Sequence, residues 1–254
     1  MSADLFDLGG RAAIVTGASS GLGARFARTL RAAGADVVVA ARRLERIEAL
    51  ASELGSDHTL AIPVDVREEP AMAALVDRCV ERFGRLDVMV NNAGMADRGP
   101  AEDESTETFA EVLAVNLAAV FTGCREAARV MLAQGRGSIV NVASVLGLVG
   151  SWRIPNAGYS ASKGGVVSLT RDLGSQWARR GVRVNAIAPG WFQSEMTAPL
   201  FEGQNWERYL ERTVPAGRAG TESELEGVLL FLASDASSYV IGQTIAVDGG
   251  WSVV

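Results

Sequence analysis

The sequence predicts an α/β domain in which a seven-stranded parallel sheet is covered by helices on both faces. Short apolar segments rich in Val, Ile and Ala alternate with amphipathic helical segments along all 254 residues. The apolar segments lack the polar alternation of half-exposed strands, so they fit strands buried on both faces. Strand–helix–strand repetition then favours a doubly wound sheet. No Pro/Ser-rich linker, charge block or repeat divides the sequence, so we expect residues 1–254 to form a single domain.

The expected elements follow one another in regular order. The predicted strands are Ala12–Thr16, Asp36–Ala41, Thr59–Val64, Val88–Asn91, Ser138–Val142, Arg183–Ala188 and Thr244–Val247. The predicted helices lie between them, at about Gly21–Ala33, Leu44–Leu54, Pro70–Phe83, Thr106–Ala133, Tyr159–Arg180 and Ser223–Ser234. Each strand except the last is therefore followed by a helix, as a parallel sheet requires.

Charge and composition exclude several classes of function. The formal net charge is −6 and the sequence pI is about 5.0, which disfavours a nucleic-acid partner. The two cysteines, Cys79 and Cys124, are too few for a disulfide scaffold and are expected to be buried free thiols. His58 is the single histidine, so we expect no metal site. Met1–Gly10 has no signal-peptide pattern, and no uncharged apolar run reaches the length of about 18 needed to span a bilayer. We expect a cytoplasmic protein without a membrane partner.

A glycine-rich turn, Thr16-Gly-Ala-Ser-Ser-Gly-Leu-Gly23, follows the first predicted strand and begins the first helix. Glycine permits positive φ and close backbone approach, and a helix N-terminus offers free N–H groups to a pyrophosphate. The spacing GxxxGxG differs from the common GxGxxG, and a tight structural corner is the alternative. The position favours a dinucleotide site, whose residues are Gly17, Ser19, Ser20, Gly21, Leu22 and Gly23.

The end of the second predicted strand bears on the choice of cofactor. An acidic residue at this place holds the 2′-hydroxyl of NAD, whereas an arginine accepts the 2′-phosphate of NADP. The sequence has Arg42 and Arg43 and no acid there. The alternative is that they are solvated arginines, but a helix start favours acidic residues. We therefore expect Arg42 to contact the cofactor, with NADP(H) favoured and NAD(H) possible.

Tyr159 and Lys163 are four residues apart at the start of a long predicted helix, which places both on one face. Only about one tyrosine in a thousand is ionised at pH 7. A neighbouring ammonium lowers the pKa of the phenol, so Tyr159 is a candidate for proton transfer to or from a substrate oxygen. A surface pair at chance spacing is the alternative.

Six motifs in order give the sequence a family resemblance. They are Thr16–Gly23, Asn91–Gly94, Asn116, Ser144, Tyr159–Lys163 and Pro189–Gly190. From about Leu8 to Trp251 the sequence resembles the single-domain short-chain dehydrogenases/reductases. The resemblance implies a Rossmann-type fold and a ketone/alcohol oxidoreductase with a small-molecule carbonyl or alcohol substrate.

The resemblance also implies residue roles. Tyr159 is implied to be the catalytic acid/base, and Lys163 to lower its pKa and hold the nicotinamide ribose. Ser144 would orient the substrate oxygen, and Asn116 would hold a water in the proton relay. The remaining implied cofactor contacts are Asp65 and Val66 at the adenine, Asn92, Ala93 and Gly94 beneath the adenine-side ribose, and Pro189, Gly190 and Ser194 at the nicotinamide.

The segment Trp191–Tyr209 is rich in aromatic residues and follows Pro189–Gly190. We expect it to cover the nicotinamide as a lid, and with the lengthened loop Trp152–Ile154 to favour a hydrophobic cyclic or aryl substrate. The alternative is that these aromatic residues pack a short helix onto the body. If the substrate were a sugar, the expected polar partners would be Gln193, Glu195 and Asn156.

Two other functions stay open. A 3-oxoacyl-thioester reductase would need a basic entrance for an acidic carrier protein, and only the scattered arginines Arg125, Arg129 and Arg153 are available. A non-catalytic dinucleotide-sensing protein is also compatible with the fold. The resemblance implies a homotetramer or homodimer, with the apolar C-terminal run Ile241–Trp251 as an interface.

Overall fold

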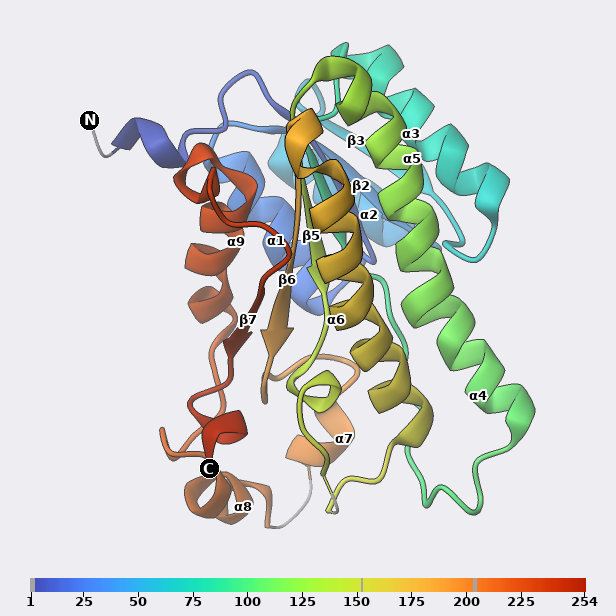
Figure 1. The fold of residues 1–254 in the computed structure, drawn as a ribbon, viewed down its shortest axis with the longest axis vertical. Coiled ribbons are helices and arrows are strands. Elements are labelled where there is room, and N and C mark those ends of the chain that lie inside the picture. Colours follow the sequence, from blue (N-terminus) through green and yellow to red (C-terminus); the bar gives the residue numbers. More distant parts are fainter. Residues whose placement is uncertain (1–2, 152, 203–204) are drawn as a thin grey trace.

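The computed structural model describes residues 3–151, 153–202 and 205–254. Seven parallel strands form one sheet in the order β3-β2-β1-β4-β5-β6-β7, which confirms the predicted fold class (Figure 1). The strands are β1 Ala12–Thr16, β2 Asp36–Ala41, β3 Thr59–Pro63, β4 Val88–Asn91, β5 Gly137–Val142, β6 Val182–Pro189 and β7 Thr244–Val247. The helices are α1 Gly21–Ala32, α2 Leu44–Leu54, α3 Glu69–Phe83, α4 Thr106–Leu113, α5 Ala119–Gln134, α6 Ala157–Trp177, α7 Ala198–Phe201, α8 Trp206–Thr213 and α9 Glu226–Ala233.

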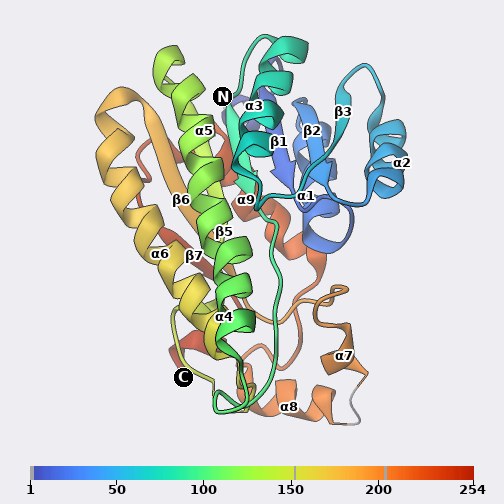
Figure 2. The same ribbon diagram turned by 90° about the vertical axis from the view of Figure 1, so that its right-hand side faces the viewer.

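Two apolar layers hold the helices against the sheet. Alternate residues of β1 point to opposite faces, so Val15 packs with α1, α2 and α9 whereas Ile14 packs with α3, α5 and α6. Continuous Val, Ile and Ala runs form these strands because both faces are buried. Figure 2 shows α4 and α5 as one continuous helical rod with α6 beside it across the second face.

The predicted helix Thr106–Ala133 is a composite. It begins as α4, passes through a π-helical turn at Ala114–Ala118 and continues as α5 to Gln134. Thr106–Gln134 is long and apolar enough to cross a bilayer by length and composition, with a mean hydropathy of 1.3 over its most apolar window. Here it covers the sheet, because Val120, Cys124 and Met131 belong to the core of the second face. A core helix of this composition passes the same test.

Two short helices, α7 and α8, were not among the predicted elements. The segment that contains them was expected to form a lid. It lies beyond the end of β6 (Figures 1 and 2). The predicted helix Tyr159–Arg180 starts earlier, at Ala157, and its last residues, Ala178–Arg180, form a 3₁₀ turn. Cys79 and Cys124 are buried free thiols as predicted, and burial raises the pKa of each to about 12.

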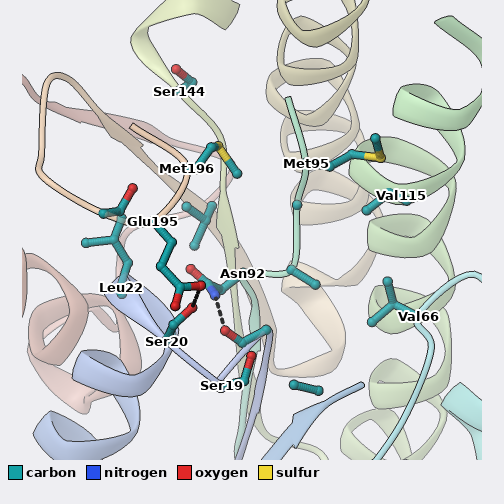
Figure 3. Close-up of a pocket in the computed structure, with 18 of the residues that line it drawn as sticks. Ser19, Ser20, Leu22, Val66, Asn92, Met95, Val115, Ser144, Glu195 and Met196 are labelled. Carbon is teal, nitrogen blue, oxygen red and sulfur yellow. Dashed lines mark hydrogen bonds between the residues drawn. The ribbon is translucent and has the colours of Figure 1, made fainter. Parts of the chain in front are cut away.

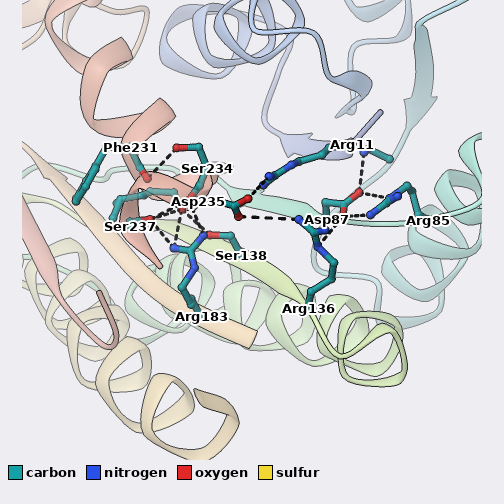
Figure 4. A network of polar contacts seen from close by, with 12 residues as sticks. Arg11, Arg85, Asp87, Arg136, Ser138, Arg183, Phe231, Ser234, Asp235 and Ser237 are labelled. Atoms are coloured by element: carbon teal, nitrogen blue, oxygen red, sulfur yellow. Dashed lines mark hydrogen bonds and ion pairs between the residues drawn. The ribbon is translucent and has the colours of Figure 1, made fainter. Parts of the chain in front are cut away.

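A polar network connects residues at the amino-terminal ends of the strands, at the edge of the sheet opposite the groove described below (Figure 4). Asp87, which is 3% exposed, accepts hydrogen bonds from the backbone N–H of Ala12 at 3.0 Å and from Nε and Nη2 of Arg85. Arg183 donates to the carbonyls of Leu232 and Ser234 at the end of α9. The Asp87 bonds join β1 to the start of β4, and the Arg183 bonds join β6 to the end of α9.

Candidate functional site

A groove of about 570 Å³ opens at the carboxyl ends of the parallel strands. The sheet order reverses between β1 and β4, and ligands of doubly wound folds bind in the crevice at such a point. The predicted site residues that line this groove are Gly17, Ser19, Ser20, Gly21, Leu22, Gly23, Arg42, Asp65, Val66, Asn92, Ala93, Gly94, Ser144, Tyr159, Lys163, Pro189, Gly190 and Ser194. Figure 3 shows part of this lining.

The glycine-rich turn makes a cradle that side chains would fill. A Cβ on Gly23 would lie 2.3 Å from the Gly17 carbonyl oxygen, and Gly17 itself has φ +68°. Asn92 donates its side-chain amide to the Thr16 carbonyl at 2.9 Å and ties the turn to β4. The Ser20 side chain forms no capping bond at the start of α1. Free N–H groups and close backbone approach therefore fit the pyrophosphate of a dinucleotide.

Arginines surround the end of the groove next to β2. Arg42 and Arg43 both line it. Arg43 Nη2 donates to Ser19 Oγ at 2.9 Å and to Ser20 Oγ at 2.8 Å, so this guanidinium lies directly above the glycine-rich turn. Glu195, from the segment after β6, pairs with Arg43 at 2.9 Å and also with Arg46. Hydrogen bonds from these two arginines lower the Glu195 pKa to about 2.

Asp65 follows β3 and was expected at the adenine. Its carboxylate binds Arg67 through several hydrogen bonds, the shortest at 2.6 Å, and these lower its pKa to about 2. Arg67 also pairs with Glu111 of α4 at 3.3 Å. At the groove wall beside Val66, the negative charge of Asp65 is therefore balanced by Arg67.

Tyr159 lies half-buried near the start of α6, and its ring packs against an apolar cluster that contains Leu146 and Trp191. Burial raises the pKa of its hydroxyl above the ordinary value, while a hydrogen bond with Ser144 and the charge of Arg98 lower it. Ser144 follows β5 and is 7% exposed. The hydroxyl is therefore protonated at neutral pH in this arrangement, as a proton donor must be.

Lys163 lies one helical turn beyond Tyr159 and is 3% exposed. It donates to the Val142 carbonyl at 2.7 Å, and burial lowers its pKa to about 8. Gly94 leaves room for the neighbouring Asn116, since a Cβ at this position would lie 3.3 Å from Asn116 Oδ1, whereas its distance to the Lys163 ammonium, 3.7 Å, would be an ordinary contact. The predicted influence of Lys163 on the Tyr159 pKa stays a prediction, because the groups that lower that pKa here are Ser144 and Arg98.

Asn116 is buried in the π-helical turn and, among the described residues, is not part of the groove lining. Its Oδ1 accepts the Met95 N–H at 2.9 Å, and its Nδ2 donates to the Met95 carbonyl and to Ser162 Oγ. The side chain thereby clamps the segment after β4 to α6. Its predicted role in holding a water stays a prediction.

The aromatic residues of the expected lid mostly pack on one another. Trp191 contacts Trp206 and Trp251 edge to face, with ring centres 5.3 and 5.4 Å apart, and Tyr209 stacks on Trp206. In the part of the chain that the structure describes, none of these four rings lines the groove. The alternative interpretation, aromatic packing of a short helix, therefore fits better. Trp152 lies outside the described residues.

Sequence reasoning missed one charged group near Tyr159 and misplaced another. Arg98 is half-buried near Tyr159 and donates to the Met196 carbonyl at 2.9 Å, and its loop position carries no motif that signals a role. Glu195 was expected beside a sugar substrate but binds the arginines at the β2 end instead. Its partners lie about 150 residues away along the chain, so no local pattern reveals the contact.

Comparisons with known proteins agree with this geometry. The family model described as enoyl-(acyl carrier protein) reductase, of the short-chain dehydrogenase type, matches residues 17–252. The 2-dehydro-3-deoxy-D-gluconate 5-dehydrogenase of Escherichia coli K12 is 40% identical over 252 residues, 97% of each chain. The galactitol 2-dehydrogenase (L-tagatose-forming) of Cereibacter sphaeroides is 40% identical over 250 residues, 98% of each chain.

A solved structure extends the similarity to three dimensions. It is a gluconate 5-dehydrogenase from Burkholderia cenocepacia J2315 in complex with NADP and tartrate, with a TM-score of 0.95, 36% identity and 100% of both chains covered. The sequence motifs, the fold and the comparisons thus agree on the family. The chain belongs to the short-chain dehydrogenase/reductase family.

Proposed function

We propose that this protein is an NAD(P)(H)-dependent oxidoreductase that interconverts a secondary alcohol and a ketone on a polyhydroxy carboxylic acid. The observation that carries the substrate class is Arg98, a half-buried cation close enough to Tyr159 to lower the pKa of its hydroxyl. Among the described residues, no carboxylate lies within ion-pair distance of Arg98. A substrate carboxylate is the natural partner of such a guanidinium.

The groove residues fit a nicotinamide dinucleotide, which supplies or accepts the hydride when it is bound. The turn Gly17–Gly23 holds the pyrophosphate, and Lys163 holds the ribose on the nicotinamide side. Arg42 and Arg43 favour NADP(H), because a guanidinium pairs well with a 2′-phosphate. The solved Burkholderia relative, which contains NADP, supports this preference, and NAD(H) is possible as a second cofactor.

In the reductive direction, Tyr159 donates the proton that the substrate oxygen acquires. Ser144 holds that oxygen by a hydrogen bond, and the same hydroxyl lies beside Tyr159. In the oxidative direction, Tyr159 accepts the proton instead, which requires a lower pKa than burial alone allows. The positive charge of Arg98 favours the ionised tyrosine that can accept this proton, and we expect the Lys163 ammonium to act in the same way.

The names of the relatives support a sugar-derived substrate, since they include a gluconate derivative and galactitol. The hydrophobic cyclic or aryl substrate expected from the sequence loses its main support, because Trp191, Trp206 and Tyr209 pack on one another. A carrier-protein substrate is also disfavoured, since Arg125 and Arg129 are both paired with Glu126. A homotetramer or homodimer and a cytoplasmic location stay predictions.

Steady-state kinetics with NADP⁺ test the proposal by comparing a C6 polyhydroxy acid (gluconate), a C6 polyol (galactitol) and 1-phenylethanol. We expect the highest kcat/KM for the acid. Arg98→Met should lower it about tenfold or more for the acid and much less for the polyol, the size of one lost charge-assisted bond. Arg171→Met, on the exposed side of α6, is the matched control.

Each other outcome has a clear meaning. The highest kcat/KM for 1-phenylethanol would restore the hydrophobic substrate and reject the carboxylate. An equal loss for acid and polyol in Arg98→Met would show that Arg98 does not recognise a carboxylate. Tight dinucleotide binding without turnover of any substrate would favour the non-catalytic sensing protein.

A further inference from the structure

The carboxylate of Glu195 lies among arginines at the β2 end of the groove, where a cofactor phosphate is expected to bind. Glu195 Oε2 accepts from Arg43 Nη2 and from Ser20 Oγ, both at 2.9 Å. Its other oxygen, Oε1, binds Arg46 of α2. Figure 3 shows this side chain reaching down from the segment after β6 to Ser20 on the glycine-rich turn. Glu195 therefore spans the groove from the β6 side to the β2 side.

The Arg43 atom that binds Glu195 also binds the two serine hydroxyls of the glycine-rich turn. Nη2 points at Ser19 Oγ and Ser20 Oγ as well, so guanidinium and hydroxyls converge on one place above the turn. A phosphate there would accept from the same three groups. The carboxylate and the phosphate are both anions, and they cannot both accept these hydrogen bonds.

We propose that Glu195 is a specificity-determining residue whose carboxylate competes with the 2′-phosphate of NADP(H) for Arg43 and so restrains the preference over NAD(H). The inference rests on the proposed function, namely that a dinucleotide binds with its adenine-side ribose next to β2. It adds a specific counterweight to the arginines that favour NADP(H). NAD(H) has no phosphate at this position, so its binding does not require Glu195 to move.

The ion pairs of Glu195 are weak enough to be displaced. The side chains of Arg43, Arg46 and Glu195 are 44%, 51% and 53% exposed. Exposed ion pairs contribute little to stability, because water screens the charges and the side chains lose freedom on pairing. A phosphate with nearly two negative charges is therefore able to replace a carboxylate on Arg43.

The displaced carboxylate nevertheless stays near the phosphate. Its backbone lies in a turn that is fixed on both sides of Glu195, because Thr197 Oγ1 donates to the Phe192 carbonyl at 2.6 Å and accepts the Ser194 N–H at 2.8 Å. Like charges held close to each other weaken binding. The penalty falls on NADP(H) alone, which makes Glu195 a determinant of the ratio of affinities.

Equilibrium binding of NADPH and NADH, without substrate and at one low ionic strength, tests this inference. Glu195→Gln keeps the shape and removes the charge. We expect the ratio Kd(NADH)/Kd(NADPH) to rise about tenfold, chiefly through tighter NADPH binding. Adenosine 2′,5′-bisphosphate should gain affinity in the same way, whereas 5′-AMP should not.

Two further variants sharpen the result. Glu53→Gln removes a carboxylate of 51% exposure that is paired with Arg28 outside the groove lining, and it should leave the ratio unchanged. Adding Arg43→Gln to Glu195→Gln should abolish the gain, because the two residues act on the same phosphate. A gain that survives in this double variant would overturn the role of Arg43.

An unchanged ratio in Glu195→Gln would overturn the inference. An equal weakening of NADPH and NADH would overturn it too, since Glu195 would then be a strap that holds the loop over either cofactor. Failure of the unaltered protein to bind either dinucleotide would reject the proposed function itself, which is a distinguishable result.

Discussion

The Lys163 ammonium lies 5.6 Å from the centre of the Tyr159 ring and donates its hydrogen bond to the Val142 carbonyl. Both side chains project from α6 one turn apart, so the spacing of four residues places them together as the sequence predicts. Burial lowers the pKa of the ammonium to about 8. Lys163 therefore begins to lose its proton just above neutral pH, beside the ring whose hydroxyl is expected to transfer one.

The first prediction concerns that hydroxyl. Tyr159→Phe removes the oxygen and keeps the ring, which packs against the cluster of Leu146 and Trp191. We expect at least about a hundredfold loss of kcat, the scale of a general acid, with dinucleotide affinity nearly unchanged. Single-turnover hydride transfer and a binding titration measure the two effects separately. Near-normal turnover would remove Tyr159 from the chemistry.

The buried ammonium gives a second prediction, on stability. Because the folded pKa of Lys163 is about 8 and its ordinary value is 10.5, the unfolded chain binds more protons between these pH values. The free energy of unfolding therefore rises with pH across this window, and the burden of the buried charge is full below about pH 8. Lys163→Met should stabilise the protein by about 1–3 kcal/mol at pH 7 while abolishing activity.

Urea denaturation at a series of pH values from 7 to 9.5 checks this sign. The advantage of Lys163→Met should be constant below about pH 8 and shrink steadily above it. Lys163→Arg, which keeps the charge, should show no such gain. A stability difference that does not change with pH would mean that the effect comes from packing and not from the ammonium.

The cofactor arginines give a third prediction. If Arg42 or Arg43 pairs with the 2′-phosphate, its replacement by Ala should weaken NADPH far more than NADH. We expect a ten- to hundredfold change in the affinity ratio, which corresponds to one charge-assisted contact of about 1.5–3 kcal/mol. The larger effect identifies the residue that holds the phosphate. An original preference for NADH would instead refute the choice of NADP(H).

The sequence predicts the fold well because the fold depends on local patterns. Apolar runs such as Val37–Ala41 mark buried strands, and amphipathic runs such as Leu44–Leu54 mark the helices that cover them. Part of the glycine-rich turn is also local, since Gly17 has a positive φ and a Cβ on Gly23 would meet the Gly17 carbonyl oxygen. The position of the groove residues is predictable for the same reason, because they follow directly after the predicted strands and the carboxyl ends of parallel strands lie at one edge of the sheet.

The rest of the site depends on contacts that no local pattern contains. The π-helical turn around Asn116 is stabilised by bonds to Met95 and Ser162, which lie on other segments. Glu195 obtains its role only because the segment after β6 returns to the β2 end of the groove. The aromatic residues misled the substrate prediction, because enrichment in Trp and Tyr indicates packing area without showing whether a ligand or the protein occupies it.

The last prediction concerns the edge of the sheet opposite the groove. Asp87 is 3% exposed and holds together Arg85, the Ala12 N–H and, at 3.8 Å, Arg136. Removing one partner of such a buried set leaves charged and polar groups without a counterpart.

Asp87→Ala should therefore destabilise the protein by about 2–4 kcal/mol, measured by urea denaturation. Asp87→Asn keeps an acceptor for the Ala12 N–H and should lose less. Asp77→Ala, on the exposed side of α3, is the control and should stay within about 0.5 kcal/mol. Because Asp87 lies at the amino end of β4 and the groove at the carboxyl end, kcat of the folded variant should be nearly unchanged. A large fall in kcat without a loss of stability would contradict this structural role and would connect the two ends of the sheet.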